Sequence, residues 1–153
     1  MMRRFMLWGL LLLASCASER SGGEQIAQAD RAALSGWIAR VRESHAQADR
    51  RRDAAALQAL TDTATAGAPS GVDATDAVQA RQDLYVHAAS LALEIGQVAR
   101  AAELTRAGLA LPPYPGPFRA QLLIVSSRAK SALGDAAGAA TDRQAARAML
   151  AEH

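Results

Sequence analysis

Apolar residues recur every three or four positions along most of the chain, a spacing that places them on one face of an α-helix. Those between Asp30 and Ala48 are Leu34, Trp37, Ile38 and Val41. The pattern resumes over residues 54–60, directly after Asp53, a residue type that caps helix N-termini well. No segment shows the strict alternation of a half-buried strand, and β-branched residues are sparse. The sequence therefore predicts an all-α fold.

Glycine and proline mark the ends of the remaining helices. A Gly-Ala-Pro-Ser-Gly loop at residues 67–71 closes a first hairpin over residues 30–66. A proline-rich loop at residues 112–117 and a Gly134-Asp135 turn interrupt the chain further on, because neither favours a continuous helix. The other four helices are expected over residues 73–96, 98–111, 117–133 and 136–151, which makes six helices in all.

The last two helical pairs repeat at a constant offset of 38 residues. The aligned pairs are Tyr85 with Leu123, Ala89 with Ser127, Gly96 with Gly134, Ala101 with Ala139, and Gly108 with Ala146. Small residues fall where the two helices of a hairpin would cross, since bulky side chains would push the helices apart. This pattern is similar to the tetratricopeptide repeat, whose period is about 34 residues. The resemblance covers residues 83–153 and implies stacked helical hairpins in a short right-handed solenoid. A generic six-helix bundle is the alternative.

The same resemblance implies a binding surface. In tetratricopeptide proteins the first helices of successive hairpins line a concave groove that holds a peptide or a neighbouring protein. The residues that map onto this groove are Val86, Ser90, Glu94, Gln121, Ile124 and Arg128. Their mixed polar and apolar character suits an extended peptide or a partner helix. The alternative is that they are merely exposed, or covered by the first hairpin.

The N-terminus has the layout of an export signal. Arg3 and Arg4 precede an uninterrupted apolar run over residues 5–13, as in a cleavable signal peptide. That run is about half of the roughly 20 residues that a transmembrane helix needs. Leu13-Ala14-Ser15-Cys16 resembles the lipobox of bacterial lipoproteins, which implies cleavage before Cys16 and a covalent lipid on its sulfur. An ordinary secretory signal that happens to contain cysteine is the alternative.

These segments predict three regions. We expect a signal peptide at residues 1–15, a lipidated Cys16 with a flexible polar tether at 16–28, and a helical-repeat domain at 29–153. Ala17 follows the cysteine in place of aspartate, which by analogy with enteric bacteria favours the outer membrane, facing the periplasm. Cys16 is the only cysteine, and its lipidation would remove a free thiol that is unusual in an exported protein.

Charge and residue types argue against several functions. The chain has 17 basic and 15 acidic residues, and removing the leader with Arg3 and Arg4 leaves 15 of each, so no basic excess favours nucleic acid. No two of the three histidines, His45, His87 and His153, are spaced to share a metal on one helix face. Ser126 and Ser127 lie near Lys130, but Ser127 falls at a predicted helix crossing. We expect no catalytic residue, no metal and no cofactor beyond the lipid on Cys16.

The function expected from both resemblances is a non-enzymatic, membrane-anchored lipoprotein of the bacterial envelope. It would act as an interaction adaptor or assembly factor for an envelope protein or peptide partner. Two other classes stay open. One is an inhibitor or immunity lipoprotein that neutralises a toxin, and the other is a carrier of a small apolar ligand between the alanine-rich helices.

Overall fold

The computed structural model describes residues 11–114 and 116–151, with side chains from residue 27 onward. The described chain is all-α, as predicted, with six helices and no strand. The helices are α1 (Leu11–Arg51), α2 (Ala54–Ala66), α3 (Ala74–Glu94), α4 (Val98–Leu109), α5 (Pro117–Ala132) and α6 (Ala136–Ala151). Residues 1–10 of the predicted signal peptide, the side chains of the predicted lipobox, and His153 lie outside the described residues.

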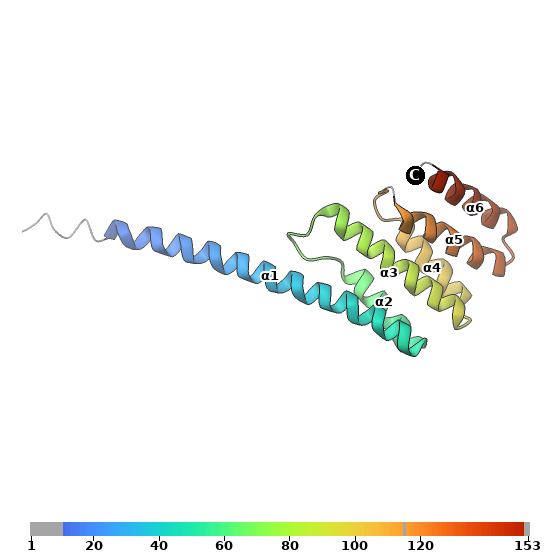
Figure 1. Cartoon of the computed structure of the whole chain (residues 1–153), viewed down its shortest axis with the longest axis horizontal. Coiled ribbons are helices and arrows are strands. Elements are labelled where there is room, and N and C mark those ends of the chain that lie inside the picture. Colours follow the sequence, from blue (N-terminus) through green and yellow to red (C-terminus); the bar gives the residue numbers. More distant parts are fainter. Residues whose placement is uncertain (1–10, 115, 152–153) are drawn as a thin grey trace, which may run out of the picture.

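Helix α1 differs from the expectation at its N-terminal end. Residues 16–28, predicted as a flexible tether, lie within α1, which begins at Leu11. Only the Gly22-Gly23 pair disfavours a helix there, at a cost of about 1 kcal/mol per glycine. Extending an existing helix is much easier than starting one. The C-terminal part of α1, which packs in the stack, therefore supports extension of the helix toward its N-terminus. Figure 1 shows this end of α1 projecting beyond the other helices.

The six helices pair into three hairpins that stack along one direction (Figure 1). These are α1 with α2, α3 with α4, and α5 with α6. Helix α3 contacts both helices of the first hairpin, and α5 contacts both helices of the second. The first helix of each new hairpin therefore packs against both helices of the preceding hairpin. The first hairpin, which does not match the 38-residue repeat, joins the stack in the same way.

Small residues lie at the predicted helix crossings. Ala89, Ala101 and Ala139 are fully buried, and Ser127 nearly so. The closest approach is at Gly108 of α4, where an added Cβ would lie 2.9 Å from the Leu122 side chain of α5 and 2.9 Å from the Cβ of Tyr85 of α3. Helix α4 is thus held against its own partner helix and against the next hairpin at one point.

Local signals set the helix starts. The Asp53 carboxylate accepts a hydrogen bond of 2.9 Å from the backbone N–H of Ala56, and Asp73 accepts one of 2.8 Å from that of Thr75. These bonds satisfy donors that the first helical turn leaves without partners. They also hold the pKa of both carboxyl groups below the usual range, since they favour the charged form. The cap predicted at Asp53 is confirmed.

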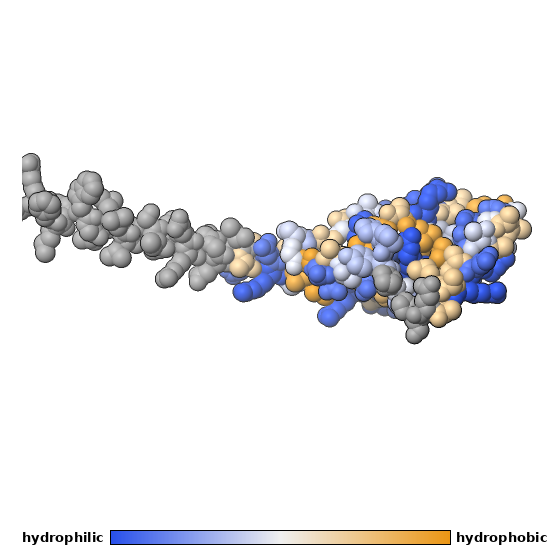
Figure 2. Space-filling view, turned by 90° about the horizontal axis from the view of Figure 1, so that it is seen from above, coloured by the Kyte–Doolittle hydropathy of each residue, from blue (hydrophilic) through white to orange (hydrophobic). Residues whose placement is uncertain are grey.

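The surface of the stack mixes polar and apolar side chains. Figure 2 shows hydrophilic and hydrophobic residues interspersed along one side of the molecule. Among the described residues, no helix combines the length and apolar character needed to cross a membrane. Of the leucines whose side chains the structure describes, two are more than half exposed, Leu133 at 54% and Leu150 at 52%. Leu150 lies on α6, close to the C-terminal end of the described chain.

Candidate functional site

The structure divides five of the six predicted groove residues between two pockets. Val86, Ser90 and Glu94 of α3 line a small pocket of about 160 Å³ against the end of α1. Val86 is buried there, and Glu94 Oε2 lies 3.7 Å from Arg52 Nη1. The first hairpin therefore covers this part of the predicted groove, which is the alternative that the sequence left open.

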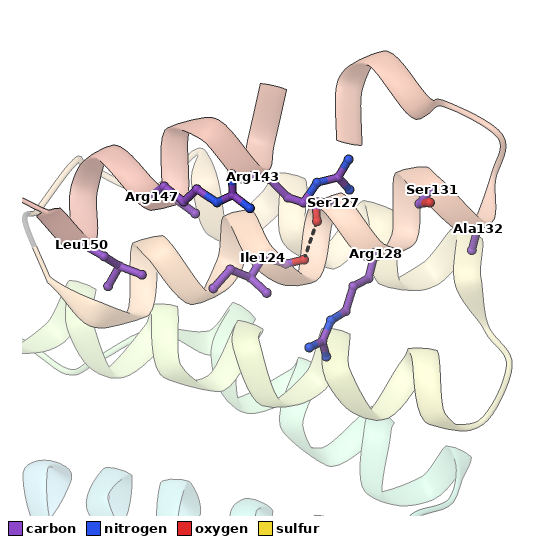
Figure 3. Close-up of a pocket in the computed structure, with 9 residues that line it drawn as sticks. Ile124, Ser127, Arg128, Ser131, Ala132, Arg143, Arg147 and Leu150 are labelled. Atoms are coloured by element: carbon purple, nitrogen blue, oxygen red, sulfur yellow. Dashed lines mark hydrogen bonds between the residues drawn. The ribbon is translucent and has the colours of Figure 1, made fainter. Parts of the chain in front are cut away.

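Ile124 and Arg128 line the other pocket, which lies between α5 and α6 and has a volume of about 650 Å³ (Figure 3). Gln121 is exposed on α5 and lines neither pocket. The residues added by the structure come mostly from α6. They are Ser127, Ser131 and Ala132 of α5, and Arg143, Ala146, Arg147 and Leu150 of α6. The structure thus does not join the six predicted residues into one groove.

Three arginines make the α5–α6 pocket cationic. Arg128, Arg143 and Arg147 are exposed, and no acidic side chain lines the pocket with them. None of the three forms an ion pair within the part of the chain that the structure describes. In Figure 3 Arg128 extends from α5 away from α6, while Arg143 and Arg147 come from α6. The pocket therefore presents several cationic groups beside apolar Ile124 and Leu150.

The repeat shows which face of the hairpin this pocket occupies. Three of the four α6 residues of the pocket correspond, 38 positions earlier, to residues of α4. The pairs are Arg143 with Thr105, Ala146 with Gly108, and Arg147 with Leu109. In the second hairpin α5 covers that face. Leu122 packs beside Gly108, and Arg119 Nη1 donates a hydrogen bond of 3.2 Å to the Leu109 carbonyl. The α6 side of the pocket therefore corresponds to the face on which a further helix would stack.

A second group of polar side chains joins α1 to α3. His45 of α1 meets Asp83 and His87 of α3, and one ligand atom from each lies within 4.8 Å of the others. His45 Nε2 lies 3.3 Å from Asp83 Oδ2, and His87 Nε2 lies 3.4 Å from Asp83 Oδ1. The two imidazole rings meet edge to face, with centroids 4.5 Å apart. These three residues, the His45–Asp83–His87 cluster, could hold a metal ion.

The environment of the cluster shifts two ionisation equilibria. The Asp83 carboxylate raises the pKa of His45, although partial burial opposes the charged imidazolium. Burial alone would raise the pKa of Asp83, but the two imidazoles outweigh it and hold that pKa well below its usual range. Asp83 is therefore a carboxylate at neutral pH.

Histidine spacing does not reveal this cluster, because its two histidines lie on different helices. The signal that could have found it is Asp83 with His87, four residues apart on one predicted helix face. The third member, His45, lies 38 residues earlier in the chain than Asp83, and only the packing of α1 against α3 brings it near. Its place could not be read from spacing.

The serine and lysine side chains of α5 have structural roles. The Ser126 hydroxyl donates a hydrogen bond of 2.6 Å to Asp142 Oδ2 of α6, and Lys130 Nζ lies 2.8 Å from the same oxygen. Ser127 is buried at its predicted crossing and donates to the Ile124 carbonyl. The two contacts with Asp142 fix α5 against α6, and therefore fix the two walls of the α5–α6 pocket.

No protein-family model, no curated protein and no solved structure matches this chain. The geometry of the pocket and of the cluster is therefore the basis for assigning a function.

Proposed function

We propose that this protein is a lipid-anchored envelope adaptor that binds an acidic amphipathic helix of a partner protein in the α5–α6 pocket. The observation that carries the proposal is the equivalence of the α6 side of this pocket to the face of α4 that α5 covers. A surface that receives a helix in one hairpin has the shape to receive one in the next. Binding a helix in an apolar groove is a common mode of peptide recognition.

The side chains of the pocket specify the chemistry of that helix. At the three α6 positions, Thr105, Gly108 and Leu109 of the preceding hairpin become Arg143, Ala146 and Arg147. A partner would therefore need carboxylates opposite the arginines, because guanidinium groups pair with carboxylates in two-pronged geometry. It would need an apolar stripe opposite Ile124 and Leu150, which is half exposed. These complementary features select an acidic, amphipathic helix.

The anchor belongs to the proposal through the resemblance of residues 13–16 to a lipobox. With a lipid on Cys16, α1 would separate the membrane from the stack. Cys16 and the buried Trp37 are 21 residues apart in one helix, which corresponds to about 30 Å at 1.5 Å per residue. The pocket lies in the last hairpin, at the opposite end of the stack from α1 (Figure 1), and would therefore lie away from the membrane.

Site-specific photo-crosslinking in cells tests this assignment. A photoreactive residue replaces Ser131, which lines the pocket, or in a matched control Gln144, which is exposed on α6 and does not line it. We expect the Ser131 probe to crosslink mainly one envelope protein, within an acidic helical segment that mass spectrometry identifies. The Gln144 probe should give little of that product.

Charge reversal supplies the second arm of the experiment. Arg143→Glu with Arg147→Glu should abolish the Ser131 crosslink, and Arg128→Glu should weaken it. Arg31→Glu on α1, an exposed arginine outside the pocket, should leave it unchanged. Equal crosslinking in the double variant, or the same products from both probe positions, would refute the helix-binding proposal. A crosslink to a second copy of this chain would mean that the pocket binds another copy of the same protein and not a separate partner.

A further inference from the structure

We infer that His45, Asp83 and His87 bind a divalent transition-metal ion of the Zn²⁺ class, and that this ion fastens α1 to α3. Two imidazole nitrogens and one carboxylate oxygen form a ligand set that zinc takes in proteins, usually with water in a fourth position. Mg²⁺ and Ca²⁺ prefer oxygen ligands throughout, so the two histidines disfavour them.

The distances in the cluster fit such an ion. A tetrahedral site with bonds of about 2.0–2.1 Å to nitrogen and oxygen places neighbouring ligand atoms about 3.3–3.4 Å apart. His45 Nε2 lies 3.3 Å from Asp83 Oδ2, and His87 Nε2 lies 3.4 Å from the other carboxylate oxygen, Oδ1. Each imidazole nitrogen thus stands at about the tetrahedral spacing from one carboxylate oxygen, and one ligand atom from each of the three residues lies within 4.8 Å of the others. An ion bound through a single Asp83 oxygen would draw the three side chains slightly closer together.

The orientation of His45 supports the assignment independently. Its Nδ1 lies 3.0 Å from the Val41 carbonyl oxygen, and since a carbonyl only accepts, Nδ1 carries the hydrogen. In the neutral imidazole Nε2 then has a free lone pair. That nitrogen is buried, and its contact with Asp83 lacks hydrogen-bond geometry, so it has no hydrogen-bond partner among the described residues. A backbone carbonyl that fixes the tautomer of a ligating histidine is the usual outer contact of a zinc site.

The exposed member of the cluster gives the ion a route in and out. The His87 side chain is 46% exposed, and it also lines the small pocket between α1 and α3. An ion bound here would therefore have protein on the side of His45 and solvent beside His87. Because the ligands come from two helices that are far apart in sequence, binding would oppose separation of α1 from the stack.

Zinc titration of the full-length chain tests the inference. The chain carries Cys16→Ser, so that its one thiol does not bind zinc, and is kept in detergent. Competition between the protein and a chromophoric chelator measures affinity for Zn²⁺ alone. We expect one Zn²⁺ per chain and a higher melting temperature with zinc than with the chelator. Co²⁺ in its place should give the intense visible absorption of a tetrahedral site.

Single substitutions distinguish this site from adventitious binding. His87→Gln changes an exposed side chain, so the fold should survive, which circular dichroism checks; affinity should fall at least about tenfold. Asp83→Asn should lower it similarly, whereas His153→Gln should not change it. Absence of zinc binding, or equal affinity in the His87 and His153 variants, would overturn the inference. Neither result bears on the α5–α6 pocket, so the proposed adaptor function is tested separately.

Discussion

Gly108 gives the sharpest test of how the hairpins stack, because α4 passes closest to its neighbours there. In an ordinary helix interior, Gly→Ala stabilises by about 0.8–1.0 kcal/mol, since alanine is the better helix former. At Gly108 the new Cβ would lie 2.9 Å from Leu122 and from Tyr85. Leu122 is fully buried and Tyr85 nearly so, so neither can turn away into solvent. Overpacking of this kind costs about 1–3 kcal/mol.

The chain offers a matched control in Gly36 of α1. It is also inside a helix, but an added Cβ would meet only the Arg40 side chain, at 3.6 Å. Gly36→Ala should therefore be stabilised by the full difference in helix propensity between glycine and alanine. Because that term is common to both variants, the difference between them isolates the crowding at Gly108. We expect Gly108→Ala to be less stable than Gly36→Ala by about 1–3 kcal/mol.

Urea unfolding followed by circular dichroism measures this difference, provided that the slope of each transition is unchanged. Thermal unfolding should agree, with Gly108→Ala melting at least about 3 °C below Gly36→Ala. Equal stability of the two variants would refute the reasoning. It would mean that α4 does not pack this tightly on α3 and α5, and the equivalence of Gly108 with Ala146 in the α5–α6 pocket would lose its support.

Two further predictions concern the α5–α6 hairpin and the anchor. Asp142→Ala removes the acceptor shared by Ser126 and Lys130 and should destabilise the fold by about 1–3 kcal/mol. The control Asp62→Ala, at an exposed site on α2, should change stability little. Chemical denaturation compares the two variants, and equal effects would contradict the role assigned to Asp142. Cys16→Ser should release the protein from membranes or leave an unprocessed precursor; a mature-sized product still found in the membrane fraction would exclude lipidation as the anchor.

The parts of the fold that the sequence predicted well are those set by local chemistry. Apolar spacing located the helices, and Asp53 and Asp73 begin α2 and α3 because their carboxylates satisfy free backbone N–H groups. The 38-residue repeat located the crossings, since only small residues such as Ala101 and Ala139 fit where helices meet. The spacing and the caps are signals within one helix, and the repeat is a comparison of one hairpin with the next.

The features that the sequence did not predict depend on how the first hairpin packs. Because residues 30–66 do not match the repeat, nothing in the pattern shows which face of α3 they cover. In the structure α1 packs over Val86, which the repeat resemblance places in an open groove. The same contact places His45 beside Asp83. One unpredicted interface therefore accounts both for the divided groove and for the missed cluster.

The two proposed sites lie at opposite ends of the stack and act on different properties. The His45–Asp83–His87 cluster joins α1, the helix that would carry the anchor, to α3, whereas the α5–α6 pocket would bind the partner. A metal ion at the first site would strengthen the link between the membrane and the stack without touching the second. His87→Gln should therefore weaken zinc-dependent stability and leave the Ser131 crosslink intact, while reversal of Arg143 and Arg147 should do the opposite. If His87→Gln also abolished the crosslink, the two ends would be coupled through α3 and α5, and the stack would not be a passive spacer.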